Sequence, residues 1–199
     1  MKHYYKGYTR KGMTIQTIPK LLSVNVGLPR SVESRGRTVR TGIFKEPVLF
    51  RIHVGRLNVD GDRQADLRVH GGPEKAVYAY DLSGYAHWRR ELSREPAFGQ
   101  FGENLTVDGL PETEVRIGDA YRIGGALLQV SEPRSPCFKL AMKMELPVFP
   151  KVFLAAGRTG FYLRVLEEGE IRAGDTIALI WREAGQVTVL EETRRIYGG

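Results

Sequence analysis

Residues 120–130 read AYRIGGALLQV and contain the strongest local structural signal in the chain. Two runs of β-forming residues, 120–123 and 126–130, are separated by Gly124 and Gly125. Both glycines can take positive φ without steric cost, as a two-residue hairpin turn requires. The stretch therefore predicts two antiparallel strands joined by a tight turn.

Short apolar or alternating runs recur on both sides of this hairpin, and each is typical of a strand. They cover residues 21–26, 48–54, 105–107, 114–117, 161–165 and 176–181. Turn residues separate these runs from one another. Many short strands with few helices predict a mainly β fold of mixed β/α character, arranged as a β-barrel.

Four stretches predict helices between the strands. The first covers residues 74–80, and the second begins near Asp81 or Ser83 and continues to residue 92 with apolar residues at helical spacing. The third begins at residues 135–137, where Ser135 can act as the N-cap. Residues 148–156 form the fourth, which Gly157 ends.

Length and composition indicate one globular domain. The 199 residues are 42% hydrophobic and 27% charged, which is ordinary for a protein with a single packed core. We expect a basic, loosely ordered extension over residues 1–19, a barrel domain over 20–185 and a C-terminal tail over 186–199. The longest apolar runs are far shorter than the roughly 20 residues that cross a bilayer, so no membrane partner is expected. A single cysteine and the lack of a secretory leader predict a cytoplasmic setting.

Positive charge is concentrated in the first quarter of the chain. Residues 1–56 contain 12 Lys and Arg against 2 Asp and Glu, whereas the remaining residues contain 18 against 21. Such asymmetry is typical of a solubilising arm or of a surface for an anion. The anion can be nucleic acid, a phosphate-bearing cofactor or an acidic partner, and charge alone does not choose among them.

Cys137 lies in the segment EPRSPCFK, residues 132–139. A predicted helix N-terminus and the neighbouring Arg134 and Lys139 all favour its thiolate form. A thiolate is a soft metal ligand, or a nucleophile able to carry sulfur as a persulfide. The alternative is a buried structural cysteine, since cysteine is among the most buried residue types.

Two glycine-containing turns are weaker candidates for an anion site. In residues 68–75, two glycines let backbone amides approach an anion, and His70 or Lys75 can add positive charge. The simpler interpretation is a strand-to-helix turn. Residues 101–105 combine a glycine with Glu103 and Asn104, and here too the simpler interpretation is an ordinary turn before the strand at residues 105–107.

Single charged residues near glycines have the same two interpretations. Lys45 can face a phosphate or be solvated, and Arg158 can bind an anion or complement a helix C-terminus. Asp62 and Asp66 resemble a carboxylate pair, but they flank a turn and are interpreted as structural.

Several enzyme classes are excluded by missing motifs. The sequence has no Cys-x-x-Cys, and its four histidines lack zinc-ligand spacing. It has no Gly-x-Gly-x-x-Gly fingerprint, no Walker loop and no Gly-x-Ser-x-Gly elbow. Zinc hydrolases, nucleotide-dependent switches and esterases of the common types are therefore not supported.

Taken together, these segments resemble the MOSC family, named for the C-terminal domain of molybdenum cofactor sulfurases. The resemblance covers about residues 20–182 and consists of six blocks in the family's order: residues 61–73, 101–105, 117–119, 130–137, 159–167 and 174–175. The chain is most similar to the stand-alone bacterial branch linked with detoxification of N-hydroxylated purines.

The resemblance implies a closed, strand-rich β-barrel of MOSC type with a few peripheral helices. It also implies that Cys137 ligates the molybdenum of a pterin-based cofactor. The cofactor's phosphate needs amides and cations, for which the candidates are Lys45, Arg68, His70, Gly71, Gly72, Lys75, Asn104, Arg134, Ser135 and Arg158. Sulfurases also contain an aminotransferase-like domain with pyridoxal phosphate; none of that domain is present here, so pyridoxal phosphate is not expected.

The leading hypothesis is a molybdenum-cofactor oxidoreductase that reduces N-hydroxylated bases or amidoximes to amines, with electrons from a separate reductase. Cys137 is the catalytic metal ligand, and His70, Glu103 or Asp66 is the proton donor. A second hypothesis is a sulfur-carrier or cofactor-binding module that holds a persulfide on Cys137 without redox turnover. A nucleic-acid-binding barrel ranks last because it leaves Cys137 unexplained. The sequence leaves the oligomeric state open.

Overall fold

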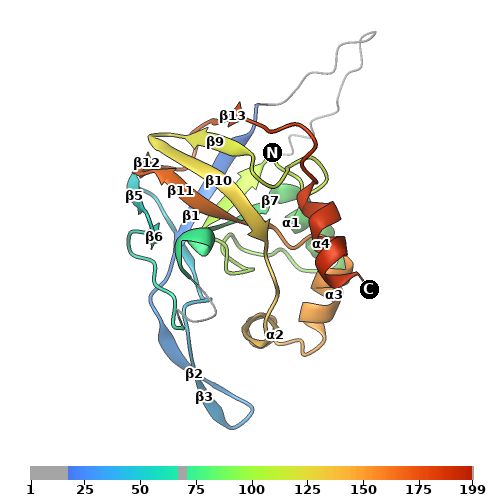
Figure 1. The fold of residues 1–199 in the computed structure, drawn as a ribbon. Coiled ribbons are helices and arrows are strands. Elements are labelled where there is room, and N and C mark those ends of the chain that lie inside the picture. The colour runs from blue at the N-terminus through green and yellow to red at the C-terminus, as the bar shows by residue number, and fades with distance from the viewer. Residues whose placement is uncertain (1–17, 67–70, 199) are drawn as a thin grey trace, which may run out of the picture.

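The computed structural model describes residues 18–66 and 71–198 and contains a large sheet, two small sheets and four α-helices among them (Figure 1). The large sheet has the strand order β13-β9-β10-β11-β7-β8-β1-β4. Its members are β1 (Lys20–Val26), β4 (Glu46–Val48), β7 (Val77–Asp81), β8 (Leu105–Asp108), β9 (Ala120–Ile123), β10 (Ala126–Pro133), β11 (Phe161–Glu167) and β13 (Ile177–Trp181).

The predicted hairpin forms the centre of one half of this sheet. β9 and β10 pair antiparallel with Ile123 opposite Ala126, so this prediction is confirmed. Gly124 has φ 53°. A Cβ at this position would lie 2.5 Å from the carbonyl oxygen of Glu170. Glycine is therefore required both by the turn and by the close approach of the neighbouring strand.

The large sheet remains open, so the predicted closed barrel is not supported. Thr176, just before β13, forms an isolated bridge with Lys20, and the Leu21 amide donates to the Asp175 carbonyl at 2.9 Å. These contacts join only the beginning of β1 to the far edge, because β1 then pairs with β8 and β4. The broader prediction of a mainly β fold with a few helices is confirmed.

Two small sheets complete the β structure. One contains β5 (Ile52–Gly55), β6 (Asn58–Val59) and β12 (Gly169–Ile171). The other is a hairpin of β2 (Arg30–Ser34) and β3 (Arg37–Thr41), which projects from the body of the molecule (Figure 1). The predicted strand 48–54 is instead split into β4 and β5 around Leu49, which is 98% exposed. The predicted strand 114–117 makes only a single bridge, Arg116 to Thr188.

The predicted helix over residues 74–80 is wrong. A short 3₁₀ turn, η1 (Pro73–Lys75), leads directly into β7, which lies between β11 and β8 and is buried along its whole length. A strand covered on both faces has no alternation, so its sequence cannot be distinguished from a buried helix by periodicity. The helix that follows, α1 (Leu82–Leu92), begins as predicted, with Asp81 accepting from the Ser83 amide at 2.8 Å.

The helix after β10 begins later than predicted. α2 (Phe138–Met144) has Cys137 as its N-cap residue, and Ser135 is exposed and does not cap it. The reason is that β10 stays paired with β11 as far as Pro133. α3 (Phe149–Ala155) confirms the fourth predicted helix.

Helix α4 (Val189–Tyr197) lies within the segment expected as a C-terminal tail. Thr188 and Glu191 form a capping box at its beginning, and Val189 and Thr193 are buried. No helix of the described residues is long and apolar enough to span a bilayer.

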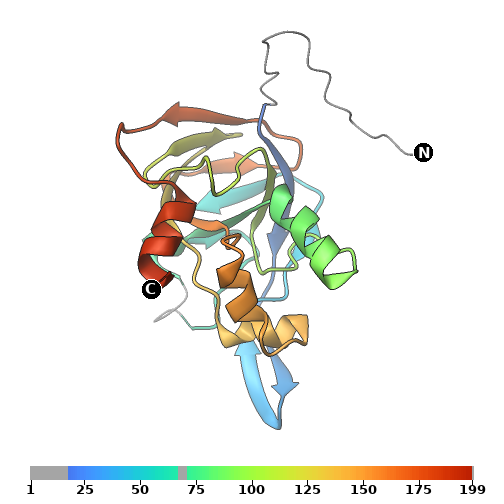
Figure 2. The same cartoon turned by 90° about the vertical axis from the view of Figure 1, so that its right-hand side faces the viewer.

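An aromatic cluster anchors the helices to one side of the sheet. It contains Tyr78, Tyr80, Tyr85, Trp88, Phe101, Leu140, Met144, Phe149 and Phe153. Figure 2 shows α2 and α3 side by side on this side of the sheet, with the β2–β3 hairpin projecting beyond α2. Because Leu140 and Met144 belong to the cluster, α2 holds Cys137 in a fixed position relative to β7.

Candidate functional site

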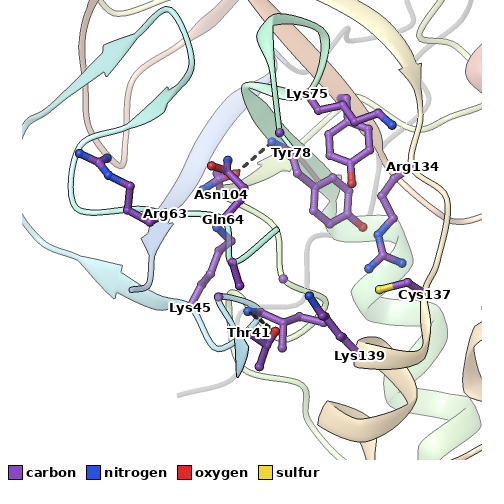
Figure 3. Close-up of a pocket in the computed structure, with 16 residues that line it drawn as sticks. Thr41, Lys45, Arg63, Gln64, Lys75, Tyr78, Asn104, Arg134, Cys137 and Lys139 are labelled. Atoms are coloured by element: carbon purple, nitrogen blue, oxygen red, sulfur yellow. Dashed lines mark hydrogen bonds between the residues drawn. The ribbon is translucent and has the colours of Figure 1, made fainter. Parts of the chain in front are cut away.

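A pocket lies where the end of β10 and the beginning of α2 face the loop after β3 (Figure 3). Six predicted site residues line it: Lys45, Gly71, Lys75, Asn104, Arg134 and Cys137. The other lining residues are Thr41, Gly42, Ile43, Arg63, Gln64, Ala65, Tyr78, Gly102, Lys139 and Tyr162. The pocket thus combines residues from six separate segments of the sequence.

Cys137 and Arg134 lie together at one side of the pocket. The thiol of Cys137 is half-buried and points toward the Arg134 guanidinium (Figure 3). Arg134 is only 5% exposed, and its Nη1 has no hydrogen-bond partner within the described part of the chain. Arg164 is the other described residue with such an atom, but its guanidinium pairs with Glu74 at 2.8 Å.

The surroundings keep Arg134 charged although it is buried. Its guanidinium carbon lies 5.4 Å from the Tyr78 ring centroid and 5.7 Å from that of Phe153. Burial opposes the charge, but the neighbouring Tyr78, Tyr162 and Cys137 outweigh it and hold the pKa of Arg134 above its ordinary value. A buried cation is costly unless an anion compensates it. The arrangement therefore favours a thiolate at Cys137 or an anionic ligand in the pocket.

The opposite side of the pocket contains a compensated cation. Lys45 Nζ lies 2.5 Å from Asp62 Oδ1, and both side chains are buried. Asp62 also accepts from the Gly27 amide and from Asn104 Nδ2, each at 3.0 Å. Burial lowers the pKa of Lys45, and the attraction of Asp62 opposes this shift. Asp62 is therefore structural, as expected, and it fixes Lys45 in the pocket wall.

The lining is strongly positive. Its charged members are Lys45, Arg63, Lys75, Arg134 and Lys139, and it contains no Asp or Glu. Lys75 makes a partly exposed ion pair with Glu132 at 3.4 Å, and such pairs neutralise charge only weakly. The pocket is therefore suited to an anion.

Glycines bring the pocket-lining loops close to one another. A Cβ at Gly42 would lie 2.3 Å from the Arg63 carbonyl oxygen. Gly102 has φ 85°, and a Cβ there would lie 2.9 Å from the Ile43 side chain. Substitution at either position would displace the loops that position Lys45 and Arg63.

Glu103, predicted as a catalytic residue, does not line the pocket. It is buried and accepts hydrogen bonds from the Tyr85 hydroxyl, the Thr106 hydroxyl and the backbone amides of Gly99 and Phe101. Burial raises the pKa of Glu103, and these donors oppose the rise. With its oxygens occupied in this way, Glu103 organises the loop before β8.

Three other predicted residues also lie outside the lining. Ser135 is exposed, Arg158 donates to the Ser83 hydroxyl at 3.3 Å, and Gly72 lies beside the pocket next to Gly71. Arg68 and His70 fall outside the described residues.

Sequence reasoning missed the aromatic wall of the pocket. Tyr78 on β7 and Tyr162 on β11 are paired across the sheet, with ring centroids 5.5 Å apart. Both resemble core residues in the sequence: Tyr78 falls in the segment predicted as a helix and Tyr162 in a predicted strand, and neither pattern shows which buried side chain faces a pocket. Arg63 had a weak signal, since it belongs to the block of residues 61–73.

Comparison with known proteins identifies the family of this chain. A family model described as "MOSC domain" matches residues 66–178. The chain is 44% identical over 169 residues to "Uncharacterized protein YflK" of Bacillus subtilis (strain 168), covering 85% of this chain and 76% of YflK. It is 38% identical over 165 residues to a protein named "Reductase" from Gibberella moniliformis, covering 81% of this chain but 29% of that protein.

The fold is shared with a solved structure, the crystal structure of YiiM from Geobacillus stearothermophilus. The TM-score is 0.76 at 37% sequence identity, and the match covers 90% of this chain and 84% of the other. The matched family segment contains Lys75, Arg134 and Cys137.

Proposed function

This chain belongs to the MOSC domain family, and from that premise and the pocket at Cys137 we propose that it binds a molybdenum cofactor and reduces N-hydroxylated bases or amidoximes to amines. For a hydroxylamine, R–NHOH takes up two electrons and two protons and gives R–NH₂ and water. A separate reductase supplies the electrons. The naming of a fungal relative as a reductase supports this reaction class.

The observation that carries the proposal is the buried Arg134 guanidinium beside Cys137. Its Nη1 lacks a hydrogen-bond partner in the described structure, and the lining has no carboxylate to offer one. An anionic group bound in the pocket would satisfy this donor. Cys137 is the single soft ligand available, and soft thiolates suit a dithiolene-bound metal.

The residues present fit this cofactor. Cys137 would hold the metal, while Arg63, Lys75 and Lys139, with the amide of Gly71, would hold the phosphate. When bound, the molybdenum centre supplies the abstraction of the oxygen atom from the substrate nitrogen.

Tyr78 and Tyr162, which form the aromatic wall of the pocket, do not supply the protons of the reaction. Burial raises the pKa of both Tyr78 and Tyr162, so both hydroxyls stay protonated. The Tyr78 hydroxyl donates a hydrogen bond to the Thr159 carbonyl at 2.7 Å, which fixes its ring against Arg134. The reaction's protons come from another group. Of the three predicted donors, Glu103 and Asp66 do not line the pocket, so His70 remains the predicted donor.

The proposal is tested by measuring reduction of an N-hydroxylated purine with reduced methyl viologen as the electron source. The enzyme comes from a host that makes the cofactor, and wild type is compared with Cys137→Ala. Wild type should turn over and Cys137→Ala should lose activity at least about hundredfold, because the metal ligand is gone. Lys151→Ala on the exposed side of α3 is the control and should match wild type.

Full activity in Cys137→Ala would contradict the proposal. A second outcome would favour the sulfur-carrier alternative instead. In that case neither protein is active, and wild type carries a reducible adduct of about +32 Da on Cys137.

A further inference from the structure

The β2–β3 hairpin forms a positively charged arm. Among the described residues it pairs with no third strand, and Arg35 and Gly36 form its turn with φ 51° and 71°. Positive φ at both turn residues is the two-residue geometry that matches strand twist. The arm therefore holds its side chains on a defined ribbon outside the core.

The charge on this arm is unbalanced. Arg30, Arg35, Arg37 and Arg40 are all exposed, whereas Glu33 is its one acidic residue and accepts a hydrogen bond from the Thr38 hydroxyl at 2.5 Å. Arg35, Arg37 and Arg40 make no ion pair within residues 18–66 and 71–198. The arm thus carries four of the 12 Lys and Arg residues of the first quarter of the sequence and one of its two acidic residues.

The base of the arm is part of the pocket wall. Thr41, the last residue of β3, lines the pocket. Arg30, the first residue of β2, lies over the Phe44 ring at 4.1 Å. Lys143 of α2 donates to the Ile43 carbonyl at 2.9 Å and so ties this loop to the helix after Cys137. A partner molecule bound along the arm would therefore lie beside the pocket.

We propose that the β2–β3 hairpin is the docking arm for a small acidic redox protein that delivers electrons to the pocket. This inference rests on the proposed function, which consumes two electrons per turnover. Two one-electron donors, each oxidised by one electron, balance the reaction. The carboxylates of such a donor complement the unpaired guanidinium groups, and electrostatic attraction of this kind speeds encounter.

The arm is less suited to single-stranded nucleic acid. Proteins of that class stack bases on exposed aromatic side chains. Residues 28–41 contain no aromatic residue, and Phe44 is covered by Arg30. Small interfaces dominated by charge are instead typical of electron-transfer encounters.

The test compares two triple charge reversals of equal size in the full chain. The arm variant is Arg35→Glu, Arg37→Glu, Arg40→Glu. The control is Arg89→Glu, Arg90→Glu, Arg194→Glu, at exposed positions on α1 and α4. None of the six residues lines the pocket. The probes are a plant-type [2Fe–2S] ferredoxin and a flavodoxin, both acidic, with a 20-base-pair DNA duplex for comparison.

In the binding assay, the wild-type Kd for the acidic proteins should weaken about tenfold between 50 and 300 mM salt. The arm variant should weaken it by a similar factor at low salt, and the control by less than about twofold. No binding of either acidic protein, or equal weakening by both variants, would overturn the docking proposal. Arm-dependent binding of the duplex alone would overturn it in favour of nucleic acid.

A turnover assay separates this proposal from the proposed function. With reduced methyl viologen, the arm variant should match wild type, because a small donor needs no docking surface. With reduced ferredoxin, the arm variant should lose at least about tenfold in rate. Equal ferredoxin-driven rates in the two variants would overturn the docking proposal, whereas absence of viologen-driven turnover in wild type would overturn the proposed function.

Discussion

Two buried cations face the same pocket and are compensated in opposite ways. Lys45 is paired with Asp62, whose remaining hydrogen bonds come from Gly27 and Asn104. Arg134 has no carboxylate partner among the described residues, and the thiol of Cys137 points toward its guanidinium. The first pair is complete within the protein, whereas the second needs an anion from outside. Lys45 is thus part of the pocket's structure, whereas Arg134 is available to bind an anionic ligand.

The largest expected effect is a loss of stability when the ion pair between Lys45 and Asp62 is broken. Asp62→Asn leaves Lys45 buried without a negative partner, so the free energy of unfolding should fall by about 3 kcal/mol. Denaturant unfolding of the cofactor-free protein measures it. Asp60→Asn, two residues away and exposed, is the matched control and should leave stability unchanged. Equal stability of the two variants would show that Lys45 is not held by this pair.

The second prediction concerns Arg134, the cation without a carboxylate partner. Its substitution should affect ligand binding rather than stability. Arg134→Met should change the stability of the cofactor-free protein little, because Arg134 has no carboxylate partner to lose among the described residues and an apolar side chain takes its place. Cofactor content should nevertheless fall at least about tenfold, since the thiolate and the bound anion lose their cation. Arg164→Met, whose guanidinium pairs with Glu74, is the control for cofactor content.

A thiol-reactivity profile sharpens this prediction. The pH profile of iodoacetamide modification of Cys137 should shift to higher pH in Arg134→Met, because the neighbouring cation that favours the thiolate is gone. An unchanged profile together with unchanged cofactor content would place Arg134 outside the site.

The smallest predicted effect concerns a third buried ionisable group, Glu112, whose raised pKa favours the uncharged carboxyl. Burial raises its pKa from 4.5 to about 7, and its carboxyl accepts from the Gly160 amide at 2.8 Å. Between pH 4.5 and 7 the folded protein binds more protons at this site than the unfolded chain does. The free energy of unfolding should therefore decrease as pH rises through this window, by about 1 kcal/mol per pH unit.

Glu112→Gln removes the titrating group and keeps an oxygen for Gly160. The difference in free energy of unfolding between Glu112→Gln and wild type should be near zero below pH 4.5. It should increase in favour of the variant toward pH 7. A constant difference between the two proteins over pH 4.5 to 7 would refute the raised pKa.

The parts of the fold that the sequence predicted correctly depend on local chemistry. Gly124 and Gly125 specify a turn by themselves, and Asp81 caps α1 through its own side chain. Cys137 and Arg134 are three residues apart, so their association was visible before any tertiary contact was known.

The parts that were missed depend on contacts between distant segments. The sequence of β7 predicts a helix because burial on both faces removes the alternation that identifies a strand. Lys45 meets Asp62 and Tyr78 meets Tyr162 only after folding. Glu103 looked like a free carboxylate in a glycine turn, but it is occupied by four hydrogen-bond donors from the surrounding loop and from α1 and β8.

The most direct test of the central claim is the molybdenum and pterin content of freshly purified protein from a host that makes the cofactor. Wild type is measured beside Cys137→Ala. Near-stoichiometric molybdenum and pterin in wild type, with molybdenum lost from the variant, is the predicted result. Equal molybdenum content in the two proteins would contradict the assignment of Cys137 as the metal ligand.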